Sequence, residues 1–97
     1  MIRLPATPAR NDLQALAADG YSVAWIAEQL GMSHSAVNRL RRGETARTSE
    51  YTIAAVARLR QRLAGSSPAE HGIPERVSAV VRLSAARRDL DTKPVTQ

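Results

Sequence analysis

The stretch Val23–Gly43, VAWIAEQLGMSHSAVNRLRRG, decides the fold of this chain. Ser22 is expected to cap the first of two helices, and Gly31 to end it in the left-handed conformation that glycine adopts without steric cost. After a two-residue step, Ser33 is expected to cap the second helix. Two short helices joined by so tight a turn predict a helix-turn-helix over about Val23 to Arg42.

The interior of such a motif needs a small residue where the helices cross, a glycine in the turn and an apolar stripe on the facing sides. Ala27 is the small residue and Gly31 the turn glycine. The stripe is expected to consist of Ile26, Leu30, Met32, Val37 and Leu40. Because all of these positions are filled in register, the pattern favours a helix-turn-helix over an ordinary helical hairpin.

The outer face of the second helix is polar and basic. A helix of this kind presents its N-terminal turns to base edges in the major groove of duplex DNA. Asn38 can bond adenine with two groups and Arg39 can fork onto guanine, each pair contributing on the order of 1 to 3 kcal/mol of discrimination. The residues expected at the bases are His34, Ser35, Asn38 and Arg39.

A second set of residues is placed for contact with the DNA backbone, namely Ser33, Arg41, Arg42, Arg47 and Thr48. Ser33 lies at a helix N-terminus, which favours anions, although a capping role alone stays open. Arg41 and Arg42 end the same helix and complement its dipole. Arg47 and Thr48 lie in the next loop and at the following N-terminus, where they can hold phosphates.

The net charge of +5 is concentrated in one segment. Between Ser33 and Arg62 seven arginines face two glutamates, whereas the rest of the chain is neutral. A basic segment on a balanced chain is typical of a phosphate-binding face, although a solvated arginine-rich surface would have the same composition. Three of these arginines point in different directions around a later helix and are expected to face solvent: Arg58, Arg60 and Arg62.

The remaining segments also follow a helical period, so we expect an all-α fold, a compact bundle of four to five helices. Thr7 and Pro8 open a helix over 8–19, and Thr48 or Ser49 caps another over 49–64. Residues 44–47 are expected to form a loop, and no segment shows convincing strand alternation. The expected division is a DNA-binding domain at 1–65, a linker at 66–73, and a last helix and tail at 74–97, with 91–97 frayed.

The last helix, from Pro74 to about Leu90, has more apolar surface than a solvated helix needs. One stripe contains Val77, Val80 and Val81, and the other contains Ala79, Leu83, Ala86 and Leu90. This helix either packs on the domain or meets its partner in a homodimer, and we favour packing with a contribution to dimerisation. Alternatively Arg82, Arg87 and Arg88 make it a second DNA-contacting module that binds asymmetric sites as a monomer.

Several classes of protein are disfavoured by composition. Cysteine is absent, and the two histidines, His34 and His71, do not form a metal site alone. No Gly-rich phosphate loop or nucleophile–base set points to an enzyme, so we expect no catalysis, cofactor or metal. Neither a membrane span nor a signal peptide is recognised, and we expect a cytoplasmic protein.

The run from Val23 to Gly43, followed by a polar loop and TSEYTIAAVARL, resembles the DNA-binding domain of the lambda-repressor and Cro-like regulators. Similar short regulators are common in actinobacteria and their phages. The resemblance covers about residues 8–64 and implies a major-groove recognition helix, Ser33–Arg42, closed by an Arg-Gly pair. Val23-Ala24 replaces the Thr-Gln start frequent in that family, which removes a familiar phosphate contact, and the segment from Pro68 onward matches no known pattern.

The expected function is therefore a sequence-specific regulator of transcription, a repressor of the phage-immunity or Cro type, whose partner is duplex operator DNA. Two alternatives stay open. A recombination accessory factor of the excisionase type needs a winged helix with a strand hairpin. An antitoxin or other protein-interaction module would use the helical scaffold without touching DNA, so that Asn38→Ala and Arg39→Ala would leave its activity intact.

Overall fold

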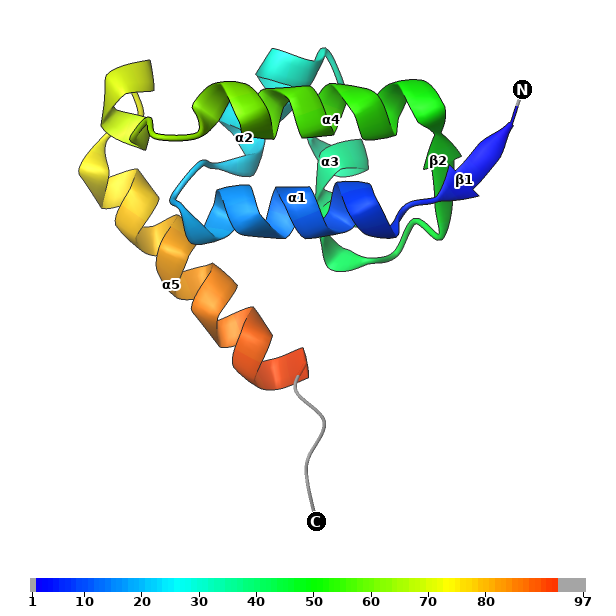
Figure 1. The fold of residues 1–97 in the computed structure, drawn as a ribbon. Coiled ribbons are helices and arrows are strands. Elements are labelled where there is room, and N and C mark those ends of the chain that lie inside the picture. The colour runs from blue at the N-terminus through cyan, green and yellow to red at the C-terminus, as the bar shows by residue number, and fades with distance from the viewer. Residues whose placement is uncertain (1, 93–97) are drawn as a thin grey trace.

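The computed structural model describes the chain over residues 2–92, with the side chains of 2–87, and has the expected mostly helical fold (Figure 1). The helices in the described part are α1 (Thr7–Ala18), α2 (Val23–Leu30), α3 (His34–Arg42), α4 (Glu50–Leu63) and α5 (Glu75–Thr92). A one-turn 3-10 helix, η1 (Pro68–His71), precedes α5. The fold class predicted from the apolar periodicity is thus confirmed.

Serine caps begin three of the helices. The Ser22 Oγ accepts a hydrogen bond from the backbone N–H of Trp25 at 3.3 Å, and the Ser33 Oγ accepts one from Ala36 at 3.1 Å. Ser49, rather than Thr48, caps α4 by accepting from the Thr52 N–H at 3.1 Å. These bonds satisfy donors that the first helical turn leaves without a partner.

The expected cap of α1 is wrong. Thr7 lies inside the helix, the N-cap position belongs to Ala6, and no side chain caps this end. The reason is tertiary, because the Ala6 N–H donates to the carbonyl oxygen of Ala46 at 2.9 Å. That bond joins the start of α1 to the loop after α3 and sets the helix entry.

A two-stranded sheet is the feature that the sequence did not predict. Strand β1 (Arg3–Pro5) pairs antiparallel with β2 (Arg47–Ser49), with Leu4 opposite Thr48. The segment expected as a loop therefore ends in a strand. Three residues are too few to show a period of two, and the partner strands are far apart in the sequence, so local pattern could not reveal the pairing.

The helices form two layers around one core. Helices α1 and α4 lie side by side and run in the same direction, and α2 and α3 lie behind them in Figure 1. Of the predicted stripe, Ile26, Val37 and Leu40 are buried, and Leu30 and Met32 are partly buried against the same core. Other helices contribute Leu13, Leu16, Val56, Leu59 and Leu63.

The chain from α4 to α5 packs on this core. Within 66–73, where we expect a linker, Pro68 and Ile73 are buried. The start of α5 lies against α1, and the helix then extends away from the bundle (Figure 1). Helix α5 runs two residues past the expected end, to Thr92.

Neither apolar stripe expected on α5 coincides with its buried face. Val77 packs on the core, whereas Val80 of the same stripe is 63% exposed and Leu83 of the other stripe is 64% exposed. Ser78, which neither stripe includes, is fully buried. The expected side-chain roles of Arg88 and Leu90 lie outside the described side chains, and residues 93–97 lie outside the described chain.

Candidate nucleic-acid interface

Helix α3 has one buried and one exposed face. Val37 and Leu40 are buried and fix the direction of the core. At about 100° per residue, Ser35 and Arg42 project opposite that direction. Asn38 and Arg39 flank them, and His34 and Arg41 lie at one margin of the exposed face. The sequence-predicted contact residues of this helix are therefore brought together on one surface.

The turn before α3 keeps this surface in place. Gly31 has φ +66° and Gly43, at the other end of α3, has φ +81°. Both lie in the left-handed region, where a side chain would be strained. The two glycines end α2 and α3 at the points predicted from sequence and thereby set the length of the exposed helix.

The four residues expected at the bases differ in their surroundings. His34, Ser35 and Arg39 are exposed, whereas Asn38 is half-buried. The Asn38 Oδ1 accepts a hydrogen bond from the Arg41 Nη2 at 2.7 Å. An amide oxygen has two lone pairs, so one acceptor position and both amide protons remain for a base edge. Arg41 thus acts on Asn38 as a positioning residue.

Among the residues expected at the DNA backbone, Ser33 is exposed, and its hydroxyl is engaged in the cap of α3. Arg41 is half-buried, and Arg42 is exposed and 3.6 Å from Glu44, an ion pair open to solvent. Pairs of this kind contribute little, so Arg42 is easily released to another anion.

The side chains of Arg47 and Thr48 point to opposite faces of the sheet, because the two residues are neighbours in strand β2. Arg47 is exposed. Thr48 is only 8% exposed and faces Leu4 across the sheet. Because its side chain is packed in the interior, Thr48 offers almost no surface to a phosphate, and this burial argues against the expected contact with the DNA backbone. The pairing with β1, which the sequence did not predict, is the reason for this burial.

Sequence reasoning missed two groups of α1 at the end of α3. The Gln14 Nε2 donates to the carbonyl oxygen of Arg41 at 3.1 Å. The Arg10 guanidinium lies over Gly43, where an added Cβ would be 3.2 Å from its Nη1. Both satisfy or complement the carbonyl end of the helix, whose partial charge is negative. Only packing of α1 on α3 brings these residues there.

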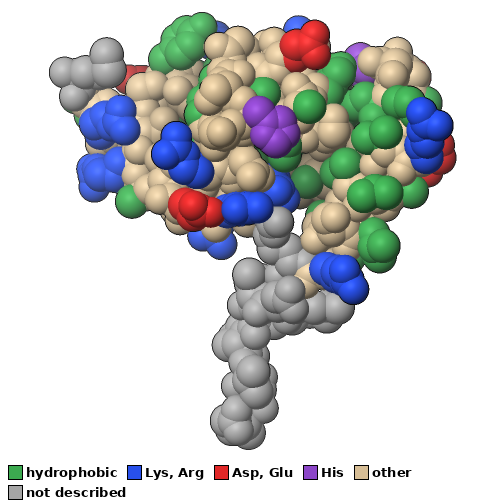
Figure 2. All heavy atoms as spheres, turned by 180° about the vertical axis from the view of Figure 1, so that it is seen from behind, with side chains coloured by type: hydrophobic (Ala, Val, Ile, Leu, Met, Phe, Trp, Pro, Cys, Tyr) green, Lys and Arg blue, Asp and Glu red, His purple; other side chains and the backbone are tan. Residues whose placement is uncertain are grey.

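Arginines gather on the face that contains α3. Figure 2 shows the molecule from the side of α3, with basic side chains gathered toward the strands. The arginines of α3, the strands and the neighbouring end of α1 are Arg3, Arg10, Arg39, Arg41, Arg42 and Arg47. The three arginines of α4 are exposed as expected, and Arg60 is bonded to Asp12 at 2.7 Å.

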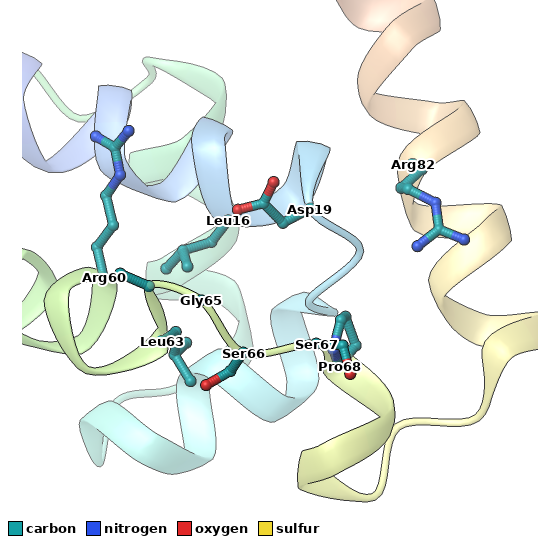
Figure 3. A pocket seen from close by; sticks show the side chains of 10 residues that line it. Leu16, Asp19, Arg60, Leu63, Gly65, Ser66, Ser67, Pro68 and Arg82 are labelled. Carbon is teal, nitrogen blue, oxygen red and sulfur yellow. The ribbon is translucent and has the colours of Figure 1, made fainter.

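The described residues contain no group of three or more His, Cys, Asp or Glu that could hold a metal ion. A pocket of ≈ 530 Å³ lies where the C-terminal ends of α1 and α4 meet α5 (Figure 3). Its two arginines, Arg60 and Arg82, are paired with Asp12 and Glu75.

Burial, followed by the nearby charge of Asp19, raises the pKa of Tyr21 above its ordinary value. Tyr21 is part of the core, where its ring lies 5.3 Å from that of Trp25, and it is far from ionising at neutral pH.

In the described part of the chain, no helix has the length and apolar character needed to cross a membrane. Comparison with protein-family models, curated proteins and solved structures finds no match to this chain.

Proposed function

We propose that this protein is a sequence-specific regulator that binds duplex DNA through α3 and represses transcription, as a phage-immunity or Cro-type repressor does. The observation that carries the proposal is the two-sided character of α3. Val37 and Leu40 anchor the helix in the core, while its opposite face is polar and basic and lies open to solvent. A rigidly held helix of this composition suits the major groove.

The positions of the side chains on this surface indicate which of them contact the bases and which contact the phosphates. Ser35, Asn38 and Arg39 project toward the base edges, and His34 borders them. Asn38 is oriented by Arg41, which reduces the entropy lost when it pairs with a base. Ser33, Arg41, Arg42 and Arg47 lie around these residues and act on the phosphates.

The geometry of the sheet bears on the excisionase alternative. A wing is a hairpin of consecutive strands, whereas β1 and β2 are separated by three helices. The paired strands are thus unlike the hairpin that this alternative requires, which favours a repressor. The Asn38→Ala and Arg39→Ala variants distinguish DNA binding from the interaction-module alternative, because they impair only a protein that contacts DNA through α3.

The test begins with selection of binding sites from random duplex DNA, followed by fluorescence anisotropy at several salt concentrations. The Arg39→Ala and Asn38→Ala variants are each expected to lose about 5- to 150-fold in affinity for the selected site, with little loss on unrelated duplex. Arg58→Ala, which removes an exposed arginine of α4, is the matched control. Wild-type binding that ignores salt, or α3 variants that bind normally, would contradict the proposal.

A further inference from the structure

The two-stranded sheet holds two arginines on its outer face. Leu4 and Thr48 face the interior, and alternate residues of a strand point to opposite sides, so Arg3 and Arg47 share the other face. The Arg3 Nη2 donates to the Arg47 carbonyl oxygen at 3.2 Å, and the Arg47 Nη2 donates to the Arg3 carbonyl oxygen at 3.0 Å. This reciprocal pair of bonds keeps both guanidinium groups on one small exposed surface.

The positive charge of this pair is not neutralised within the described residues. The ion pairs there involve Arg42, Arg60 and Arg82, and neither Arg3 nor Arg47 takes part in one. Each guanidinium has five N–H donors and uses one of them in the bonds across the sheet. In the register Arg3 lies opposite Ser49 and Arg47 opposite Pro5, so the two arginines are diagonal neighbours whose like charges repel, and a bound anion would remove that repulsion.

We propose that Arg3 and Arg47 form a phosphate-binding site, called here the strand clip, for a backbone phosphate of duplex DNA. The inference rests on the proposed function and extends it to the N-terminal strand, since Arg3 was not among the predicted contacts. Guanidinium groups match the oxygens of a phosphate with paired hydrogen bonds. Only the short loop after Gly43 separates α3 from β2, and the hydrogen bond from the Ala6 N–H to the Ala46 carbonyl oxygen ties that loop to the start of α1.

A backbone phosphate is favoured over a free anion by the exposure of the site. Both arginines are exposed, so the surface does little to desolvate a small anion, and a single exposed ion pair contributes about 0 to 1 kcal/mol. A polyanion held at the same time by α3 binds the clip as a second, intramolecular contact, which needs no strong site.

The experiment measures the dissociation constant of the full chain for its selected duplex against salt, for Arg3→Gln, Arg47→Gln and the double variant. Because both arginines hold the same phosphate, the double variant loses one phosphate contact, which should lower the slope of log K on log salt by about 0.9. Its affinity should fall about eightfold at about 0.1 M salt and about threefold at about 0.3 M, and each single variant should lie between wild type and the double variant. Discrimination between selected and mutated duplex should not change, and Arg58→Gln should leave the slope intact.

Thermal melting shows whether each variant is folded. Where glutamine weakens the sheet, Arg3→Lys keeps the charge, and it should retain the slope while losing affinity by the same factor at every salt concentration. An Arg3→Lys protein with unchanged affinity would contradict the clip.

The clip and the proposed function fail in different ways. If wild type selects no duplex, both are overturned. If wild type binds and Arg39→Ala loses specificity, but the double glutamine variant keeps the wild-type slope, only the clip is overturned. Saturable binding of inorganic phosphate at constant ionic strength, lost in the double variant without a change in the DNA slope, would assign the site to free phosphate and overturn the DNA clip.

Discussion

The two glycines that end α2 and α3 allow a matched test of which contacts hold α3 in place. Gly31 and Gly43 both have left-handed backbones, with φ +66° and +81°. A Cβ at Gly31 would meet nothing within 4 Å, whereas a Cβ at Gly43 would lie 3.2 to 3.3 Å from three atoms of the Arg10 guanidinium. Alanine at either position therefore has the same cost in backbone strain, and only alanine at position 43 has the further cost of a close contact with Arg10.

The shared cost is conformational. An L-residue in the left-handed region loses about 1 to 2 kcal/mol, and alanine recovers about 0.4 to 1 kcal/mol by restricting the unfolded chain. Gly31→Ala should therefore destabilise by about 1 kcal/mol, which lowers the melting temperature of a chain this long by about 5 °C. Gly43→Ala should also displace Arg10 from the carbonyl end of α3, which adds about 0.3 to 1 kcal/mol.

Urea denaturation followed by circular dichroism measures both changes, provided that the m-value stays constant. In the Arg10→Ala background, the cost of Gly43→Ala should fall to that of Gly31→Ala, because the contact is then absent. A neutral or stabilising Gly31→Ala would refute the argument from the left-handed turn. Costs of Gly43→Ala and Arg10→Ala that simply add would refute the role given to their contact.

Ser33→Ala and Ser49→Ala should each destabilise by about 1 kcal/mol through loss of a cap, measured by urea denaturation, and only Ser33→Ala should also weaken binding to the selected duplex. Ile26→Ala should cost about 2 to 5 kcal/mol, because Ile26 is fully buried, and a midpoint within error of wild type would contradict its place in the core. Because folding raises the pKa of Tyr21, its hydroxyl loses the proton at a lower pH in the unfolded chain than in the folded one. The stability that protonated Tyr21 contributes to the folded state is therefore complete below about pH 10, and it is lost as the pH rises through the pKa of the folded state. Melting curves from about pH 8 to 11 should therefore fall more steeply for wild type than for Tyr21→Phe, and parallel curves would count against this coupling.

Local signals predicted the helix-turn-helix closely. The limits of α2 and α3 coincide with the expected serine caps and glycine ends, because a cap or a left-handed turn depends on residues only a few positions apart. The exposed side of α3 followed from its helical period for the same reason. Prediction failed at Thr7 and Thr48, where pairing with a distant segment decided the conformation and the burial.

Some features of the candidate site were likewise predictable from local sequence, and others were revealed only by the structure. The sequence predicted that α3 directs four side chains away from the buried Val37 and Leu40, namely His34, Ser35, Asn38 and Arg39. That Arg41 bonds Asn38, and that Arg10 and Arg3 join the basic face, could not be read from sequence. The first depends on side-chain rotamers, and the others on segments that folding brings together from far along the chain.

The amino-acid sequence by itself determined the helices, their caps, the inward stripe and the sign of the exposed surface, since each depends on neighbouring residues and on the helical repeat. Only the tertiary structure decided the sheet, the burial of Thr48 and the pairing of Arg3 with Arg47. Those features depend on contacts between the N-terminus and the segment after α3, and a short strand has no local pattern that names its partner.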